Sequence, residues 1–329
     1  MTIVISICVI TYNHEKYIRA CLDSILSQQL QCAFEVIIRD DASTDGTAAI
    51  LLEYSSRYPN IVTVLPTDGN IGANANLLET FRYGAGEFIA VCEGDDYWTD
   101  TEKLARQLTC AREMPAVNFF THPALVGDAQ RDKLRTWPCE RSSSFSVRDI
   151  LSDLGQFAPT ASYFFRRSVL SALPTWFARA PIGDFFMELY FTGHALGYSS
   201  PEIMSKYRTV SDGSWDDGIR KDRTGEKGVR AYRLMKVFLK KARPDFLGFE
   251  DDFKKRLVML NFAIAHQYMK VGNYSKFLRY INKAGVEVCT ISRSAAFLFR
   301  VRHLKPAVFA LYNLKKIGAY AKTFLQFRR

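Results

Sequence analysis

Four short apolar runs, separated by stretches of helical periodicity, constrain the fold more than any other feature of this sequence. The first, residues 3–10, is almost continuously apolar and rich in β-branched residues, which is typical of a strand buried on both faces of a parallel sheet. The later strand-like runs are 34–38, 61–65 and 88–92, and the helical stretches between them are 15–28, 47–58 and 75–84. This βαβαβαβ order predicts an α/β fold with a mostly parallel, doubly wound sheet.

Acidic clusters follow two of these runs, at the strand ends where open α/β sheets bind ligands. Asp40-Asp41 follows residues 34–38. Two adjacent acids after a buried strand are costly unless hydrogen-bond donors satisfy them, and a nucleotide base with an imide N–H and ribose hydroxyls would supply such donors. The alternative is a capped turn leading into a solvated loop, because Ser43 and Asp45 are good helix-capping types.

Glu93-Gly94-Asp95-Asp96 forms a denser cluster directly after residues 88–92. Carboxylates at this density suit a hard divalent cation such as Mg²⁺ or Mn²⁺. A diphosphate leaving group needs such a cation to neutralise its developing charge. Gly94 lets the backbone approach a ligand closely. The alternative is an acidic turn at the surface, which the preceding buried strand disfavours.

Three motifs in register point to a family. Residues 6–13 (SICVITYN), 39–47 (RDDASTDGT) and 93–98 (EGDDYW) closely resemble those of family 2 glycosyltransferases, and most of all the bacterial branch that builds capsule, O-antigen and other surface polysaccharides. The resemblance implies a GT-A fold, Rossmann-like, with a mostly parallel sheet flanked by helices. It also implies inverting transfer of a sugar from a nucleotide-diphosphate sugar, by family habit a UDP-sugar, to a hydroxyl of a glycan or lipid-linked acceptor.

The resemblance assigns roles to the matching positions. Thr11 and Tyr12 match the strand end that holds the nucleotide base, where Tyr12 would stack on it, and Asp41 matches the acid that accepts a hydrogen bond from the base. Asp95 matches the metal-binding acid, so Mn²⁺ or Mg²⁺ is the expected cofactor. Glu93 stands where an Asp is usual in the family, and it would bind either the ribose of the donor or the metal ion. Asp96 would assist in binding the ribose or the metal ion.

A phosphate-binding cation is expected from the second half of the chain. Many family members carry an Arg after the Asn-x-Gly loop, but residues 70–76 contain none. Tyr207-Arg208, followed by residues 211–215, resembles the loop that closes over donor phosphates. Arg208 is therefore the candidate for the diphosphate and Trp215 for a sugar face, the alternatives being a surface cation and a core aromatic.

Inverting transfer also needs a general base that takes the proton of the acceptor hydroxyl. The resemblance places this acid at the start of a helix in the second half, where Asp184 precedes the helical pattern of residues 185–195. The alternative for Asp184 is a helix N-cap. Glu188, one turn later, is the fallback base, although a solvent-facing helical acid is the favoured interpretation. Residues 159–162 would line the acceptor side.

The remaining chain is helical and basic. The formal net charge is +10, and from Lys236 onward Lys and Arg clearly outnumber Asp and Glu. We expect a catalytic domain over residues 1–225 and a helical, basic C-terminal region over 226–329. Basic, aromatic and leucine residues mixed in 297–305 and 311–329 suit interfacial helices on an anionic membrane, the alternative being a helical subdomain with a solvated basic face.

Cysteines and apolar runs bear on location. The chain has seven cysteines, an odd number without any CxxC pair, which is typical of reduced thiols in a cytoplasmic protein. Residues 1–7 lack a basic n-region and predict a strand rather than a signal peptide. No uncharged run reaches the roughly 18 apolar residues that a spanning helix needs. The expected location is therefore cytoplasmic, peripheral to the inner membrane.

Other functional classes fit less well. A sugar nucleotidyltransferase shares nucleotide, metal and sheet topology, but it usually carries a Gly-rich basic loop after the first strand, which residues 11–15 lack. A nucleic-acid-binding protein is suggested only by the basic tail, so no nucleic acid partner is expected. The five histidines are scattered and are interpreted as structural or exposed, and G-x-S-x-G and GxxxxGK[ST] motifs are absent.

Overall fold

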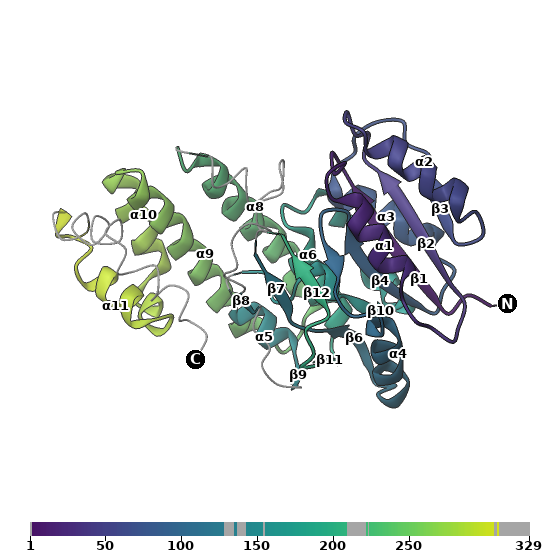
Figure 1. The fold of residues 1–329 in the computed structure, drawn as a ribbon. Coiled ribbons are helices and arrows are strands. Elements are labelled where there is room, and N and C mark those ends of the chain that lie inside the picture. The colour runs from purple at the N-terminus through teal and green to yellow at the C-terminus, as the bar shows by residue number, and fades with distance from the viewer. Residues whose placement is uncertain are drawn as a thin grey trace. The chain divides into compact units, whose positions relative to one another are not determined.

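The computed structural model describes residues 2–127, 135–136, 143–153, 155–208, 222, 224–305 and 308. Trp215 and the basic stretch 311–329 lie outside these residues. The chain divides into two compact units (Figure 1), one formed by residues 1–150 with 155–214 and the other by residues 151–154 with 215–329.

The first unit follows the predicted alternation of strands and helices. In chain order, the elements up to the acidic cluster are β1 (Ile5–Thr11), α1 (Ile18–Leu26), β2 (Phe34–Asp40), α2 (Thr47–Arg57), β3 (Val62–Leu65), α3 (Ala73–Tyr83), β4 (Phe88–Glu93) and β5 (Tyr97–Trp98). The next are α4 (Lys103–Glu113), β6 (Val117–Thr121), β7 (Ala124–Val126), β8 (Arg135–Thr136), β9 (Ser143–Phe145) and α5 (Val147–Ser152). The last are the 3-10 turn η1 (Thr160–Ser162), β10 (Phe164–Arg166), the 3-10 turns η2 (Arg167–Ala172) and η3 (Phe177–Arg179), α6 (Gly183–Thr192), β11 (Leu196–Ser199) and β12 (Ser205–Tyr207).

Within the described residues, the main sheet has the strand order β3-β2-β1-β4-β10-β6-β11-β9. Strands β1 to β4 are mutually parallel, and β10 enters antiparallel between β4 and β6. Strands β6 and β11 are parallel, and β9 closes the edge antiparallel to β11. A smaller sheet has the order β5-β12-β7-β8. The expected mostly parallel α/β sheet flanked by helices is confirmed.

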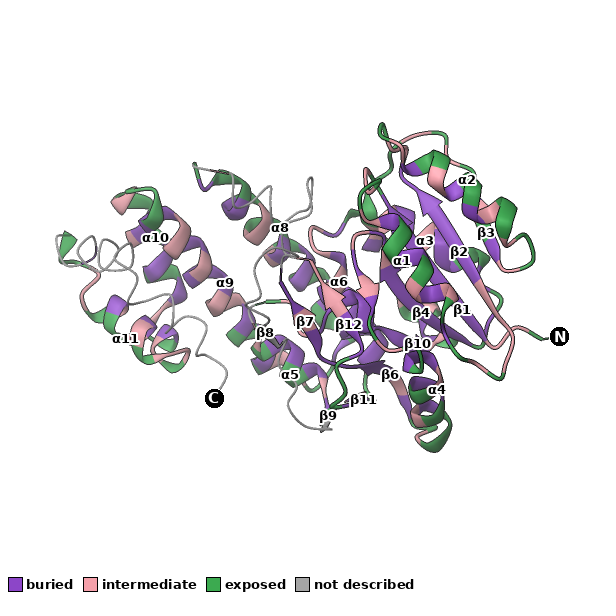
Figure 2. Ribbon diagram, viewed as in Figure 1, coloured by how far each residue is buried: buried purple, intermediate pink, exposed green. Residues whose placement is uncertain are grey.

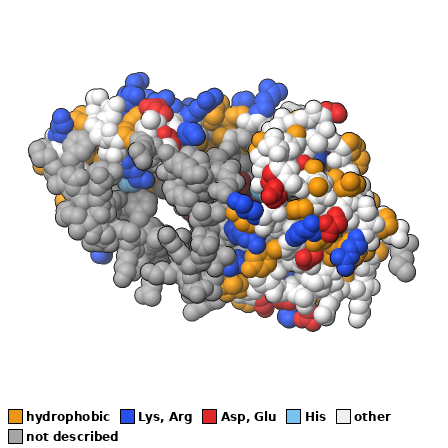
Figure 3. Space-filling model, turned by 45° about the horizontal axis from the view of Figure 1, so that its top comes forward, with side chains coloured by type: hydrophobic (Ala, Val, Ile, Leu, Met, Phe, Trp, Pro, Cys, Tyr) orange, Lys and Arg blue, Asp and Glu red, His pale blue; other side chains and the backbone are white. Residues whose placement is uncertain are grey.

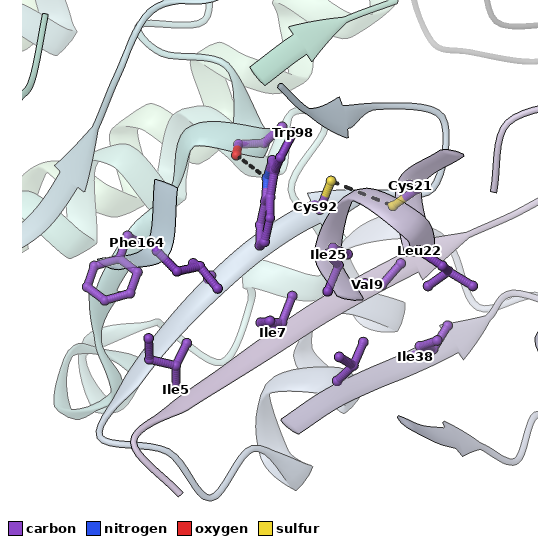
Figure 4. Close-up of a cluster of buried hydrophobic side chains, with 14 of the residues drawn as sticks. Ile5, Ile7, Val9, Cys21, Leu22, Ile25, Ile38, Cys92, Trp98 and Phe164 are labelled. Carbon is purple, nitrogen blue, oxygen red and sulfur yellow. Dashed lines mark hydrogen bonds between the residues drawn. The ribbon is translucent and has the colours of Figure 1, made fainter. Parts of the chain in front are cut away.

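Both faces of the main sheet are covered, as the continuous apolar runs require. All seven residues of β1 are buried, and Figure 2 shows the central strands buried and the outer faces of the helices exposed. Alternate β1 residues pack against α1 (Figure 4), whose buried residues Ile18, Cys21, Leu22 and Ile25 recur at helical spacing. Phe81 of α3 contacts Phe165 of β10, and Phe164 belongs to the α1 cluster. Since successive strand residues face opposite sides, α1 and α3 cover opposite faces.

Two details go beyond the sequence-based expectation. Helix α4 was not predicted, although its buried Leu104, Leu108 and Ala111 have helical spacing. Residues 159–162, expected to line the acceptor side, include the turn η1 at residues 160–162, and strand β10 begins only at Phe164. The turn matters for the site because β10 runs antiparallel to β4. The residues before β10 therefore lie beside the carboxyl end of β4.

The second unit is helical, as expected. Its helices are α8 (Glu226–Ala242), α9 (Glu250–Lys270), α10 (Tyr274–Ala284) and α11 (Arg293–Arg300), with the short 3-10 turns η4 (Arg243–Asp245) and η5 (Val286–Thr290). Their apolar faces form a separate core that includes Phe262, Tyr268, Phe277 and Ile281. Over the described part of the chain, no helix combines the length and the apolar character needed to cross a membrane.

Candidate active site

The strand register brings the acidic clusters together. Thr11 at the end of β1 pairs with Asp40 of β2, and Ile10 pairs with Glu93 of β4. The carboxyl ends of β2, β1 and β4 are thus neighbours, and the polar residues that follow them share one edge of the sheet. The predicted base-binding and metal-binding motifs therefore lie on a single surface, as ligand sites of open α/β sheets do.

Asp40 and Asp41 are both buried but differ in what they bind. The Asp40 carboxylate accepts from the backbone N–H of Ser43 at 3.1 Å and from its hydroxyl, so Asp40 closes a turn, as the alternative interpretation held. The Asp41 carboxylate accepts from the backbone N–H groups of Ile71, at 2.8 Å, and Gly72, at 2.9 Å. Asp41 therefore fixes the loop before α3. Its Oδ1 also lies 3.6 Å from Nη1 of the buried Arg39, and its Oδ2 keeps a second lone pair.

The cluster after β4 is not a solvated surface turn. Asp96 is buried, and its Oδ1 accepts from the backbone N–H of Arg208 at 2.9 Å. Burial, then the charges of Asp95 and Glu93, raise the pKa of Asp96 well above its usual range. Burial, then Asp95 and Asp184, likewise raise the pKa of Glu93. These shifts mean that the carboxylates repel one another and that a nearby cation would stabilise their charged forms.

Arg208 lies against this cluster rather than at a free surface. Its Nη1 donates to the backbone carbonyl of Asp95. Its guanidinium lies 5.2 Å from the ring centroid of Tyr17 and 4.6 Å from that of Tyr97, which are cation–π distances. The two tyrosines were not predicted as site residues, although Tyr97 lies within the third motif and Tyr17 follows the first by four residues. Tyr12, by contrast, is 42% exposed at the end of β1, so its ring is open to solvent.

His14 was interpreted as structural or exposed, but the structure brings it to the acidic cluster. Its Nε2 lies 4.0 Å from the Asp95 carboxylate. Its Nδ1 and the Thr11 hydroxyl oxygen are buried without a hydrogen-bond partner among the described residues. The position of His14, just beyond the end of β1, was the signal that could have predicted this placement.

Gly94 is required for this close packing. A Cβ atom on Gly94 would lie 2.8 Å from Thr11 Oγ1 and 2.9 Å from His14 Nδ1. We therefore expect Gly94→Ala to destabilise the chain by about 1–3 kcal/mol, the usual range for overpacking, and to lower the thermal midpoint measured by scanning fluorimetry.

Gly228→Ala, within helix α8, is the matched control. Its new Cβ would lie 3.5 Å from the Gln267 side chain, which is an ordinary contact distance. Ala has the higher helix propensity, so the midpoint of this variant should stay constant or rise. An unchanged midpoint in Gly94→Ala would contradict the crowding at Gly94.

Helix α6 brings the predicted base to the same edge. Asp184 lies in the first turn of α6, and Ile182, not Asp184, occupies the N-cap position. The charge of Asp184 contributes to the raised pKa of Glu93, so the two carboxylates are close. The helix start is fixed by Asn74, whose side-chain amide donates to the Ala180 carbonyl at 2.8 Å. The absence of a side chain on Gly183 makes room for Asn74.

The acidic cluster fits a divalent cation only together with a phosphate ligand. Within the described ranges, no three His, Cys, Asp or Glu side chains are gathered closely enough to hold a metal ion by themselves. Mg²⁺ in nucleotide sites, however, is bound by one or two carboxylates plus substrate phosphates. Two observations are consistent with such a shared site. The buried Asp96 Oδ2 lacks a hydrogen-bond partner among the described residues, and the pKa values of Glu93 and Asp96 are both raised, first by burial and then by neighbouring carboxylates.

Curated relatives match part of the chain at about one third sequence identity. An uncharacterised protein of Mycobacterium tuberculosis is 36% identical over 216 residues, which cover 64% of this chain and 60% of that protein. The poly(ribitol-phosphate) beta-glucosyltransferase of Bacillus spizizenii is 34% identical over 110 residues, or 33% of this chain and 17% of that enzyme. The matches therefore span less than two thirds of the length of these relatives.

Solved structures share the fold at low sequence identity. S. aureus TarS 1-349, crystallised in complex with UDP-GlcNAc, superposes with a TM-score of 0.63 and 18% identity over 93% of this chain and 88% of that one. The mannosyltransferase PcManGT of Pyrobaculum calidifontis, in complex with GDP-Man and Mn²⁺, gives a TM-score of 0.55 and 16% identity over 95% of this chain and 87% of that one. These likenesses confirm the fold.

A family model decides the membership. Residues 6–173 match the model of glycosyl transferase family 2, which spans about half of the chain and contains all three motifs. The match ends before Asp184, so it covers the strand ends of the site but not the predicted base. The match and the shared fold lead to one conclusion: this chain belongs to glycosyl transferase family 2.

Proposed function

We propose that this chain transfers a glycosyl group from a nucleotide-diphosphate sugar, UDP-linked by family habit, to an acceptor hydroxyl. The observation that carries the proposal is the shared edge of the sheet, where Glu93 and Asp95 follow β4 beside the end of β1, together with Asp184 of α6. The charges of Asp95 and Asp184 both contribute to the raised pKa of Glu93. Glycosyl transfer needs stabilisation of the leaving group and removal of the acceptor proton. The acids after β4, with a phosphate-binding cation, would supply the first function, and the separate acid at the start of α6 would supply the second.

The donor site is proposed at the carboxyl edge of β1, β2 and β4. Thr11 and the exposed ring of Tyr12 would hold the nucleotide base, and Asp41 would accept from it through a remaining lone pair. Glu93 and Asp96 would bind the ribose or assist the metal. Arg208, already held against the Asp95 carbonyl, would meet the diphosphate, for which a guanidinium fork is well suited.

Asp184 is the proposed general base. Its carboxylate would take the proton of the acceptor hydroxyl while that oxygen attacks the anomeric carbon from the side opposite the diphosphate. The bond to the diphosphate breaks in the same displacement, so the anomeric configuration inverts. Asp95, with help from Glu93 or Asp96, would hold Mg²⁺ or Mn²⁺, which when bound neutralises charge on the leaving diphosphate.

The acceptor class and the extent of the catalytic region are part of the proposal. A relative named for glucosyl transfer to poly(ribitol-phosphate) supports a surface glycan or a lipid-linked precursor as acceptor. We place the catalytic domain within residues 1–225 and assign residues 226–329 to a C-terminal helical region. Apart from the short segment 151–154, the boundary between the two compact units lies between residues 214 and 215. This boundary supports the division.

A donor screen tests the function directly. UDP-, GDP- and dTDP-sugars are incubated with the full chain, Mg²⁺ or Mn²⁺, and lipid-diphosphate-linked acceptors, and both possible by-products are measured. Release of nucleoside diphosphate is the expected result. Release of inorganic pyrophosphate would instead identify a sugar nucleotidyltransferase, and turnover of none of these donors would contradict the proposal.

We also propose that the C-terminal region contacts an anionic membrane, and the exposed face of α8 supports this partner. The basic face of α8 consists of exposed Lys227, Arg230, Lys240 and Lys241 together with Leu234, 40% exposed, and Val237, 50% exposed. Figure 3 shows Lys and Arg side chains beside hydrophobic ones along the upper edge of that view. Cations flanking apolar side chains on one helix face are typical of interfacial binding to anionic lipid.

Vesicle binding provides the test. Each cation near an anionic surface contributes about 1 kcal/mol, so Arg230→Glu with Lys241→Glu should weaken partitioning to phosphatidylglycerol-containing vesicles by tenfold or more. Lys254→Glu with Lys255→Glu, the same charge change at exposed positions of α9, is the matched control. Equal binding of the two variants, or salt-dependent binding to RNA with none to vesicles, would contradict the membrane assignment.

A further inference from the structure

Glu188 is buried with no exposed surface, so the expectation of a solvent-facing helical acid was wrong. Its Oε1 accepts from the backbone N–H of Ala158 at 2.8 Å and from the Tyr163 hydroxyl at 2.7 Å. Its Oε2 accepts from the backbone N–H of Phe157 at 3.2 Å. Burial, only partly offset by these hydrogen bonds, raises the pKa of Glu188 to about 8. Burying a carboxyl group costs free energy, and an apolar side chain would fill the same space more favourably. Glu188 is therefore expected to do more than fill space.

All three donors come from one segment, residues 157–163, which we call the acceptor-side turn. The same turn is tied to the acidic cluster from its other side. The Trp98 indole N–H donates to the Ala161 carbonyl at 2.9 Å, and the backbone N–H of Val91 donates to the Tyr163 carbonyl at 3.1 Å. The turn is thus fixed to β4 and β5 at one side and to α6, through Glu188, at the other.

The position of Glu188 on α6 gives this connection its significance. Residues four apart on a helix lie on the same face, so Glu188 stands one turn behind Asp184. Tyr163 is hydrogen-bonded to Glu188, so the three groups are neighbours, and the charge of Asp184 contributes to the raised pKa of both Glu188 and Tyr163. Because Glu188 is buried and both its oxygens accept hydrogen bonds from the protein, it is a poor candidate for touching an acceptor molecule itself.

We propose that Glu188 is a positioning residue, which holds the acceptor-side turn at a fixed distance from Asp184 and so sets where the acceptor hydroxyl meets the base. The proposal rests on the glycosyl transfer proposed above. A carboxyl group is suited to this task because its two oxygens meet three converging donors. Misplacement of a reacting group by about 1 Å can cost about 10²-fold in rate, so a rigid connection between base and acceptor site has a large kinetic effect.

Glu188→Gln tests the proposal with almost no change in shape. Its amide nitrogen carries hydrogens and must face at least one of the backbone N–H or hydroxyl donors, which leaves that donor unpaired. We expect kcat/KM for the acceptor to fall by about 10²-fold, while the KM of the donor and the Kd of UDP stay constant. Hydrolysis of the donor by water should persist, because water needs no acceptor-side turn, so the ratio of hydrolysis to transfer should rise.

Two further variants separate positioning from general destabilisation. Tyr163→Phe removes one of the three hydrogen bonds and should shift the same ratio in the same direction by a smaller factor. Thr192→Val changes another buried residue of α6 one turn further on, whose hydroxyl has no hydrogen-bond partner among the described residues, and should leave the ratio unchanged. Hydrogen exchange at the Phe157 and Ala158 amides should quicken only in the Glu188 variant.

The outcomes distinguish this proposal from the proposed function. A wild-type chain that turns over no nucleotide sugar contradicts the function, and the positioning role falls with it. An active wild type with an unchanged hydrolysis-to-transfer ratio in Glu188→Gln contradicts the positioning role alone. An equal loss of hydrolysis and transfer, accompanied by a lower thermal midpoint, would likewise overturn it, because that pattern indicates a residue that only stabilises the fold.

Discussion

Asp95→Ala is expected to lower glycosyl transfer by about 10³-fold, because stabilisation of a leaving diphosphate by a bound cation is worth several kcal/mol. The same variant should lose the UDP-dependent uptake of Mn²⁺ that electron paramagnetic resonance can follow. Its thermal midpoint should not fall. Asp95 raises the pKa of both Glu93 and Asp96, so its removal relieves repulsion within the cluster.

Glu113→Ala is a suitable control for this experiment. Glu113 is an exposed acid at the end of α4 and has no part in the proposed site. The turnover and the Mn²⁺ binding of the Glu113→Ala variant should therefore match those of the wild type. If Asp95→Ala were fully active and bound the donor in the presence of Mn²⁺ as well as the wild type does, the assignment of Asp95 as a metal ligand would be wrong.

Asp184→Asn should lower turnover by about 10²–10⁴-fold while leaving the donor bound. The amide has nearly the shape of the carboxylate but cannot take the acceptor proton, and general base catalysis contributes about 10²–10⁴-fold. We expect kcat to fall within this range and the Kd of UDP, measured by calorimetry, to remain constant. The separation of the two quantities distinguishes a catalytic base from a residue that only shapes the donor site.

Asp251→Asn makes the same substitution in the first turn of another helix, at an exposed position of α9. Its activity should be unchanged. If Asp184→Asn remained active, the base would lie elsewhere, and the positioning role proposed for Glu188 would lose its partner.

Local pattern was sufficient for much of the fold. Every residue of β1 is buried, and β2, β3 and β4 end within two residues of the predicted ends. Such strands are specified by short-range composition, because a strand covered on both faces must be apolar at every position. Helix α4 was not predicted, although its apolar spacing is regular.

The site was only partly predictable. Asp95 and Asp41 stand in recognisable motifs, and resemblance alone suggested Asp184. Glu188 was misjudged because helical position does not reveal which face is covered, and in this fold the acceptor-side turn covers that face with three donors. His14 was missed because its proximity to Asp95 depends on the pairing of β1 with β4, which joins residues about eighty positions apart.

The sequence by itself determined the order of strands and helices from β1 to β4, the family and the acids at the strand ends, because each of these depends on contiguous residues. Only the tertiary structure decided which of those acids act together. The parallel register placed Glu93 beside the end of β1, and the antiparallel entry of β10 brought the acceptor-side turn to the same edge. Burial then raised the pKa of Glu93, Asp96 and Glu188. Pairing and burial depend on contacts between distant segments, which no local pattern specifies.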